Sequence, residues 1–137
     1  MGGVEMKYLL DTHAWIWLVE GSDEFPRRTV ELLKDSANSP LGLSAISPWE
    51  IAKKSSIGKL RLAMPLLDWV VSATSNPGII IYPLTPEVSV EANSLPGKFH
   101  NDPADQMIVA TARIFDLTII TCDRNILSYP YVKTFWK

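Results

Sequence analysis

The sequence predicts a single α/β domain in which helices cover both faces of a mostly parallel sheet. Short apolar runs typical of buried strands alternate along the chain with segments that carry helix start and stop signals. The chain has 137 residues, which is the usual size of one domain, and its sequence contains no repeat or low-complexity tract. We therefore expect a tail over residues 1–5 and one domain over residues 6–137.

The first strand and the first two helices are expected within residues 6–36. Residues 6–11 form an apolar run that ends in a carboxylate, as buried strands often do. Alanine, tryptophan and leucine are spaced over residues 12–19 as in a short helix. Pro26 occupies a first-turn position and predicts a second helix that continues to about Ser36.

A weak second strand and a clear helix start follow at residues 41–58. The run 41–44 is short and contains a glycine, so its strand signal is modest. After it, Ser47 is expected to cap a helix, and Glu50 stands three residues later as in a capping box. Gly58 then provides the expected helix end.

The middle of the chain predicts a helix, a buried strand and a second helix. Met64 and Pro65 begin the first of these helices, which ends before the Asn-Pro-Gly turn at residues 76–78. Residues 79–82 are continuously apolar and are expected to form a fully buried strand. Thr85 caps the helix that follows, which fades near Ser94.

The last third of the chain carries the strongest helix signal. Residues 102–105 read Asp-Pro-Ala-Asp and begin a helix whose apolar face continues to Ile114. The run 117–121 predicts a strand, and Asp123 then caps a short helical turn. Residues 131–135 are expected to add an edge strand.

Composition limits the classes of function. The 13 basic and 15 acidic residues give a formal net charge of −2, which argues against non-specific binding of duplex nucleic acid through a broad basic face. A single cysteine excludes an intramolecular disulfide and a cysteine-based zinc site. The apolar runs are far shorter than a membrane span, and the N-terminus lacks the basic start and apolar stretch of a secretion signal, so we expect a cytoplasmic protein without membrane contact.

Four carboxylates are expected at one edge of the sheet. Ligands of open parallel sheets bind beyond the carboxyl ends of the strands, where the chain enters the helices. Asp11 and Asp123 each follow a predicted strand, and Glu50 lies in the first turn of a helix that follows one. Asp105 also lies in a first helical turn, although a loop precedes it.

Each of these acids also has an ordinary structural explanation. Asp123 fits a helix cap, and both Glu50 and Asp105 fit the third position of a capping box. Their convergence would nevertheless place like charges close together, which requires a cation among them. A set of oxygen ligands without cysteine suits Mg²⁺ or Mn²⁺.

Two other classes of function remain open from the residues alone. A metal-binding phospho-acceptor domain would use Asp11 or Asp123, although no second acid stands beside Asp11. A non-catalytic binding module would use the acids only as caps and contact its partner through some of the five tryptophans. Trp15, Trp17 and Trp69 are the expected anchors. His13 and His100 are expected to pack or to form hydrogen bonds, since no nucleophile stands beside them in a triad-like pattern.

Four ordered motifs resemble the PIN-domain family, and more closely the VapC-type ribonuclease toxins of toxin–antitoxin pairs. They are Leu-Leu-Asp-Thr-His at 9–13, Ser-Ala-Ile-Ser-Pro-Trp-Glu-Ile-Ala at 44–52, His-Asn-Asp-Pro-Ala-Asp-Gln-Met-Ile-Val-Ala at 100–110 and Thr-Cys-Asp at 121–123. The resemblance implies a three-layer α/β/α sandwich, Mg²⁺- or Mn²⁺-dependent cleavage of single-stranded or structured RNA, and a homodimer. It also implies inhibition by a small VapB-like antitoxin whose C-terminal segment lies across the active site.

The resemblance assigns the acidic ligands to Asp11, Glu50, Asp105 and Asp123. Asp102 belongs to the third motif but is interpreted as the helix cap. Relatives often carry arginine directly after the helix aspartate, whereas this chain has Gln106. A salt bridge or phosphate contact from that position is therefore not expected.

The implied reaction is metal-assisted hydrolysis of a phosphodiester bond. Asp11, Asp105 and Asp123 would hold an ion, and Glu50 would hold a second ion or orient the attacking water. The number of ions stays open. Four basic residues flank the helix of Glu50: Lys53, Lys54, Lys59 and Arg61. They either guide the RNA backbone or form a solvated helix face. In the second case, Glu50 and Lys54 have the spacing of an ordinary ion pair within a helix.

Overall fold

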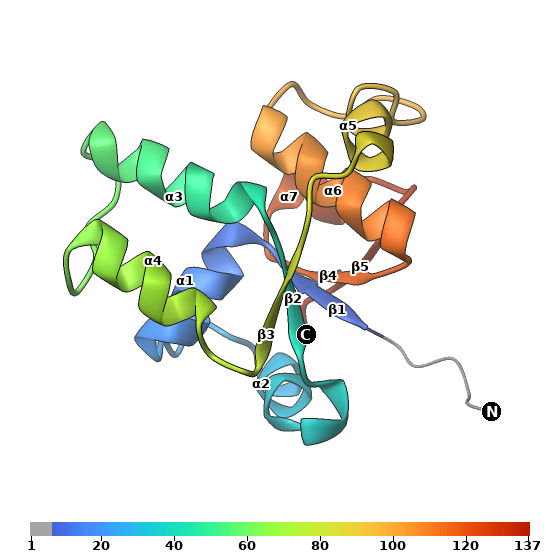
Figure 1. The fold of residues 1–137 in the computed structure, drawn as a ribbon. Coiled ribbons are helices and arrows are strands. Elements are labelled where there is room, and N and C mark those ends of the chain that lie inside the picture. Colours follow the sequence, from blue (N-terminus) through green and yellow to red (C-terminus); the bar gives the residue numbers. More distant parts are fainter. Residues whose placement is uncertain (1–6) are drawn as a thin grey trace.

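A computed structural model describes residues 7–137, so the predicted tail at residues 1–5 lies outside the described residues (Figure 1). Five strands form one sheet in the order β3-β2-β1-β4-β5, and every neighbouring pair is parallel. The strands are β1 (Tyr8–Leu10), β2 (Leu41–Ser44), β3 (Ile79–Tyr82), β4 (Thr118–Ile120) and β5 (Lys133–Phe135). The predicted parallel sheet is confirmed.

Every helix expected from the sequence is present, with small shifts at the ends. The helices are α1 (Thr12–Glu20), α2 (Arg27–Lys34), α3 (Ile46–Ser56), α4 (Leu66–Thr74), α5 (Pro86–Ala92), α6 (Pro103–Phe115) and α7 (Arg124–Leu127), with a 3₁₀ turn at Ser36–Asn38. The predicted helix 26–36 thus ends at Lys34 and continues as that turn. Within residues 7–137, no helix combines the length and the apolar character needed to cross a membrane.

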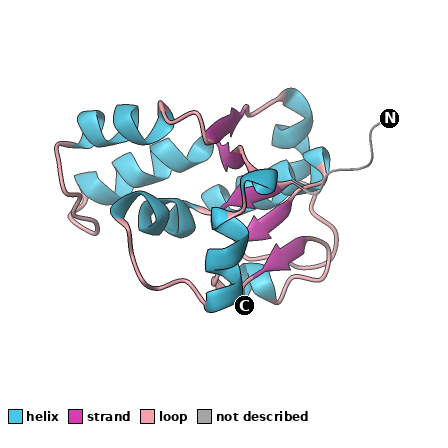
Figure 2. Cartoon of the chain, turned by 90° about the horizontal axis from the view of Figure 1, so that it is seen from below, coloured by secondary structure: helices cyan, strands magenta, loops and turns pink. Residues whose placement is uncertain are grey.

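The sheet separates two layers of helices. Side chains of β1 alternate, so Leu10 packs in one core with residues of α1 and α4, while Leu9 packs in another with residues of α6 and α7. Helix α5 packs on the outer side of α6 through Val88 and Ala110. Figures 1 and 2 show the strands between these groups of helices. The structure is the three-layer α/β/α sandwich that the resemblance implied.

The third strand differs from expectation. The continuous apolar run 79–82 predicted a fully buried strand, but β3 lies at the edge of the sheet, and Ile80 and Ile81 are exposed. Strands β1, β2 and β4, which have a neighbour on each side, are buried throughout. An apolar run signals a strand but does not reveal whether that strand lies in the centre or at the edge of a sheet.

Two of the three expected tryptophan anchors are core residues. Trp15 is 0% exposed and Trp69 is 2% exposed, and their rings meet edge to face at 5.0 Å between α1 and α4. The interpretation of these two residues as partner anchors is therefore wrong, because their apolar surface is buried within the domain. Trp17 is half-buried against Phe25 and Trp136.

The strand order determines where a ligand site can form. The chain moves from β1 to β2 and β3 on one side, then crosses to place β4 on the other side of β1. The connections that leave β1 and β4 therefore part at their carboxyl ends and leave a crevice between them. Asp11 and Asp123 follow these two strands.

Candidate active site

All four predicted carboxylates line one hollow at the carboxyl ends of β1 and β4. The hollow has a volume of about 210 Å³ and is lined by Asp11, Thr12, His13, Glu50, Lys54, His100, Asp102, Asp105 and Asp123. Helices α1, α6 and α7 bring acids there through their caps or, in α6, also through the first turn. Because α3 begins at Ile46, Glu50 reaches the hollow from the second turn of that helix, and its predicted place in the first turn is wrong. The sequence-based prediction that the acids share one edge of the sheet agrees with this arrangement.

Asp11 is buried and held from two sides. Its Oδ1 accepts a hydrogen bond of 2.8 Å from the backbone N–H of Ala14 and caps α1, and its Oδ2 accepts a hydrogen bond from the Thr121 hydroxyl. Burial raises the pKa of Asp11 above its usual range, although both hydrogen bonds oppose the rise. The carboxylate is thus fixed in orientation at the bottom of the hollow.

Glu50 is held by side chains rather than by a capping box. Its Oε1 accepts a hydrogen bond of 2.5 Å from Thr12 Oγ1, and its Oε2 lies 3.2 Å from Lys54 Nζ. Thr12 gives its only hydroxyl hydrogen to Glu50, so Ser47 must donate in the 2.9 Å contact between the two hydroxyls. A short relay from Ser47 through Thr12 therefore orients the Glu50 carboxylate.

The predicted capping role of Ser47 is wrong. Helix α3 begins at Ile46, one residue before Ser47, and its N-terminus has no side-chain cap at Ala45. The hydroxyl of Ser44, at the end of β2, accepts the N–H of Ile46 instead. The Ser47 side chain is therefore buried against Thr12, where it supports Glu50.

Asp105 carries a strongly perturbed carboxyl group. Burial and, next, the negative charge of Asp102 raise the pKa of Asp105 to about 7. Asp123 and Glu50 add to the rise, and His100 opposes it. His100 Nε2 lies 2.8 Å from Asp105 Oδ2 but is poorly aligned for a hydrogen bond, so the contact is electrostatic when the imidazole is protonated.

Asp102 and Asp123 are helix caps that also belong to the acidic hollow. Asp102 Oδ1 accepts the N–H of Asp105 at 2.9 Å, which confirms its predicted role as the cap of α6. Asp123 Oδ1 accepts the N–H of Asn125 at 2.8 Å and caps α7. A monodentate cap leaves the second carboxylate oxygen of each residue available to a cation.

The donor set fits a hard divalent cation. Glu50, Asp102 and Asp105 each place one carboxylate oxygen so that the three oxygens lie within 4.8 Å of one another. Asp11 and Asp123 line the same hollow from the ends of β1 and β4. Such a concentration of negative charge, which already raises the pKa of Asp105, is what an ion such as Mg²⁺ or Mn²⁺ relieves.

Comparison with known proteins identifies the fold family. The family model of the PIN domain matches residues 8–130, nearly the whole described chain. The chain belongs to the PIN-domain family. Ribonuclease VapC22 of Mycobacterium tuberculosis (strain ATCC 25618 / H37Rv) is 29% identical over 130 residues, which cover 93% of this chain and 97% of that protein.

Solved structures show the same PIN-domain architecture. The VapBC2 structure from Rickettsia felis, bound to a DNA fragment from its promoter, matches with a TM-score of 0.69 and 16% identity, over 96% of this chain and 100% of that one. DNA-bound VapBC from Salmonella typhimurium matches with a TM-score of 0.69 and 17% identity, over 95% and 97% of the two chains. At these identities the likeness establishes the fold.

The structure adds four residues to this PIN-domain site that the sequence-based reasoning did not assign. Thr12, Ser47 and Thr121 orient carboxylates, and His100 contacts Asp105. The signal available in the sequence was the position of two hydroxyl residues, one directly after Asp11 and one two residues before Asp123. Each hydroxyl donates instead to an acid of another element, Thr12 to Glu50 and Thr121 to Asp11, so the sequence marks these residues without revealing the acids that they orient.

Gln106 and His13 also have defined places in the PIN domain. The Gln106 side-chain amide donates a 3.0 Å hydrogen bond to the backbone carbonyl of His100, so it supports the loop that carries the imidazole. His13 is exposed at the edge of the hollow, and its ring centroid lies 6.0 Å from that of Trp17.

Proposed function

We propose that this PIN domain is a Mg²⁺- or Mn²⁺-dependent ribonuclease and the toxin of a toxin–antitoxin pair. The observation that carries the proposal is the convergence of five carboxylates in one hollow at the crevice between β1 and β4. The relative named as a ribonuclease, which matches over almost its whole length, supports RNA as the substrate. Membership of the PIN family favours this function over a phospho-acceptor domain or a binding module that uses the acids only as caps.

The residues of the hollow divide into ligands and orienting groups. Asp11, Asp105 and Asp123 offer carboxylate oxygens to an ion, and Asp102 offers the oxygen that its cap leaves unused. A bound divalent ion lowers the pKa of a water ligand and offsets charge on the phosphate. Glu50, fixed by Thr12, is placed either to ligate a second ion or to accept a hydrogen bond from the attacking water.

The partners follow from the same comparisons. Several structural relatives are complexes named VapBC, which supports a small VapB-like antitoxin as the partner of this chain. An acidic hollow is complementary to a basic segment of such a protein. A homodimer and a cytoplasmic location, where the RNA substrate resides, complete the proposal.

Cleavage of RNA by the purified, partner-free protein tests this function. We expect cleavage of a bacterial RNA pool with Mg²⁺ or Mn²⁺, loss of cleavage in EDTA and recovery when the metal is restored. The Asp105→Asn variant is the matched control, because it removes one charged ligand without changing the side-chain volume. Equal cleavage by wild type and Asp105→Asn, or full activity in EDTA, would contradict the proposal.

A further inference from the structure

The hollow contains one strongly basic side chain. Among the described residues that line it, Lys54 is the only lysine or arginine. Its Nζ lies 3.2 Å from Glu50 Oε2, and the two side chains are 30% and 11% exposed. In the sequence, Lys54 is one of four basic residues that flank the helix of Glu50, but of these four only Lys54 lines the hollow.

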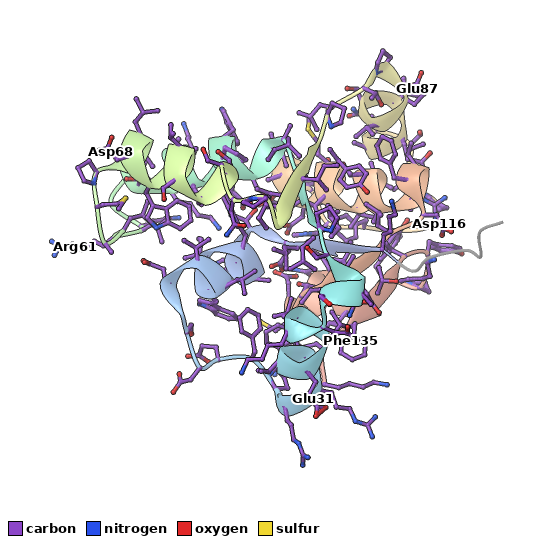
Figure 3. All side chains as sticks on the ribbon, turned by 60° about the horizontal axis from the view of Figure 1, so that its bottom comes forward. Glu31, Arg61, Asp68, Glu87, Asp116 and Phe135 are labelled. Carbon is purple, nitrogen blue, oxygen red and sulfur yellow. The ribbon has the colours of Figure 1, made fainter. Side chains whose placement is uncertain are left out.

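The other three basic residues lie outside the site. Lys53 precedes Lys54 on α3, is exposed and does not line the hollow. Lys59 and Arg61 are exposed in the connection between α3 and α4. Figure 3 shows Arg61 at the outer end of that connection, directed away from the rest of the domain. A contact with a phosphate at the hollow is therefore available to Lys54 alone of the four.

The ion pair with Glu50 competes with a metal on the same oxygen. Thr12 donates to Glu50 Oε1, so Oε2 is the more open oxygen for a cation or a water, and Lys54 lies against it. An ammonium group and a divalent ion repel each other at such range. An ion bound at Oε2 would therefore repel the Lys54 side chain from that oxygen, while helix α3 keeps Lys54 at the rim of the hollow.

We propose that Lys54 leaves Glu50 when the site is loaded and binds a phosphate of the RNA backbone at the rim. This inference rests on the proposed ribonuclease function. Five carboxylates line the hollow, so a divalent ion offsets only part of their charge, and an incoming phosphate still meets a negative surface. A flexible ammonium group released at that surface supplies the missing positive charge. Because it acts as a point charge, it can bind a backbone phosphate whatever the sequence of the RNA.

The test compares Lys54→Met with Lys53→Met, which removes the same charge from the next residue of the helix. The substrate is a short, end-labelled single-stranded RNA of mixed sequence, cleaved in Mn²⁺ over a range of KCl concentrations. We expect Lys54→Met to lose about tenfold in kcat/KM, as for one lost charge-assisted hydrogen bond. The slope of log(kcat/KM) against log[KCl] should become shallower by about 0.7, as for one lost phosphate contact on a single strand. Lys53→Met should keep both values.

A melting series in Mn²⁺ separates phosphate binding from a merely structural role. Lys54→Met removes the cation that competes for Glu50, so its melting temperature should rise with Mn²⁺ at least as much as that of wild type. If Lys54→Met is too unstable to assay, Lys54→Gln, which keeps a hydrogen-bond donor for Glu50, should show the same loss and the same salt slope.

Two results would overturn the inference while leaving the ribonuclease intact. The first is equal kcat/KM and salt slope for Lys54→Met and Lys53→Met. The second is loss of the Mn²⁺ melting response together with activity, which would make Lys54 a positioning residue for Glu50. If wild type itself cleaves no RNA in Mn²⁺, the proposed function fails, and the inference fails with it.

Discussion

Thr121 donates a hydrogen bond to Asp11 across 110 positions of sequence and thereby joins the carboxyl ends of β4 and β1. The same hydroxyl oxygen accepts the backbone N–H of Asp123 at 3.0 Å. One buried side chain therefore sets the orientation of one acid and the position of the turn that carries another. The active-site geometry depends on this hydroxyl as well as on the carboxylates.

Replacement of Thr121 by valine should destabilise the metal-free protein. The substitution keeps the shape of the side chain but leaves the Asp123 N–H without its partner and removes a donor from the buried Asp11. We expect a loss of about 1–3 kcal/mol in the free energy of unfolding, measured in urea. Thr121→Ser retains the hydroxyl and should lose clearly less; an equal loss in both variants would assign the effect to packing.

The metal-free protein should be more stable at pH 5 than at pH 8. The pKa of Asp105 is about 7 in the folded protein, whereas that of an aspartate exposed in the unfolded chain is 3.8, so between these two pH values the folded state binds more protons than the unfolded state. Stability therefore falls as the pH rises through this window. The raised pKa of Asp11 acts in the same direction.

Melting temperatures in EDTA across this pH range provide the measurement. Asp105→Asn should flatten the dependence without abolishing it, because Asp11 remains. A melting temperature that rises from pH 5 to pH 8 in wild type would contradict the account. By the same linkage, Mn²⁺ should bind more tightly at pH 8 than at pH 6, since ligation requires the deprotonated carboxylate.

Asp105 and Asp102 should differ in their response to metal. Both asparagine variants remove a negative charge from the hollow, so neither should melt below wild type without metal, and the asparagine in Asp102→Asn would still cap α6. On addition of Mn²⁺, wild type should gain melting temperature, Asp102→Asn should gain less, and Asp105→Asn should lose most of the gain. If Asp105→Asn keeps the response and Asp102→Asn loses it, the roles of ligand and cap have been exchanged.

Trp15 and Trp49 should differ in their importance for stability. Trp15 is 0% exposed in the core, so Trp15→Ala should cost about 3–5 kcal/mol in the free energy of unfolding. Trp49 is 55% exposed on α3, so Trp49→Ala should change it by only about 0.5 kcal/mol. Urea unfolding of both variants tests this; similar losses would contradict the assignment of Trp15 to the core.

Local sequence patterns predicted the helices and strands more completely than their positions within the sheet and the core. Apolar runs and helix signals located each strand and helix, and the parallel pairing followed from their alternation. The exposed edge position of β3 and the burial of Trp69 could not be predicted, because both depend on which elements become neighbours. The predicted helix start at Ser47 was wrong for a local reason, since the Ser44 hydroxyl, three residues earlier, accepts the N–H of Ile46.

The candidate site could likewise be predicted only in part from the sequence. The acids were predictable, because parallel strands bring the residues that follow them to one edge. The groups that orient the acids were not, since Thr12 and Glu50 are 38 positions apart in sequence and Thr121 and Asp11 are 110 apart. Contacts between such distant residues exist only after the sheet has formed, so no local pattern records them.

The chemical nature of the RNA ends tests the central claim most directly. Hydrolysis by a metal-activated water at the acidic hollow leaves a 5′-phosphate and a free 3′-hydroxyl on the products, whereas attack by the RNA's own 2′-hydroxyl leaves a 2′,3′-cyclic phosphate. Products of wild-type cleavage in Mn²⁺ should be ligated by an RNA ligase that requires a 5′-phosphate without prior kinase treatment. Products that carry 2′,3′-cyclic phosphates and 5′-hydroxyls would contradict the account.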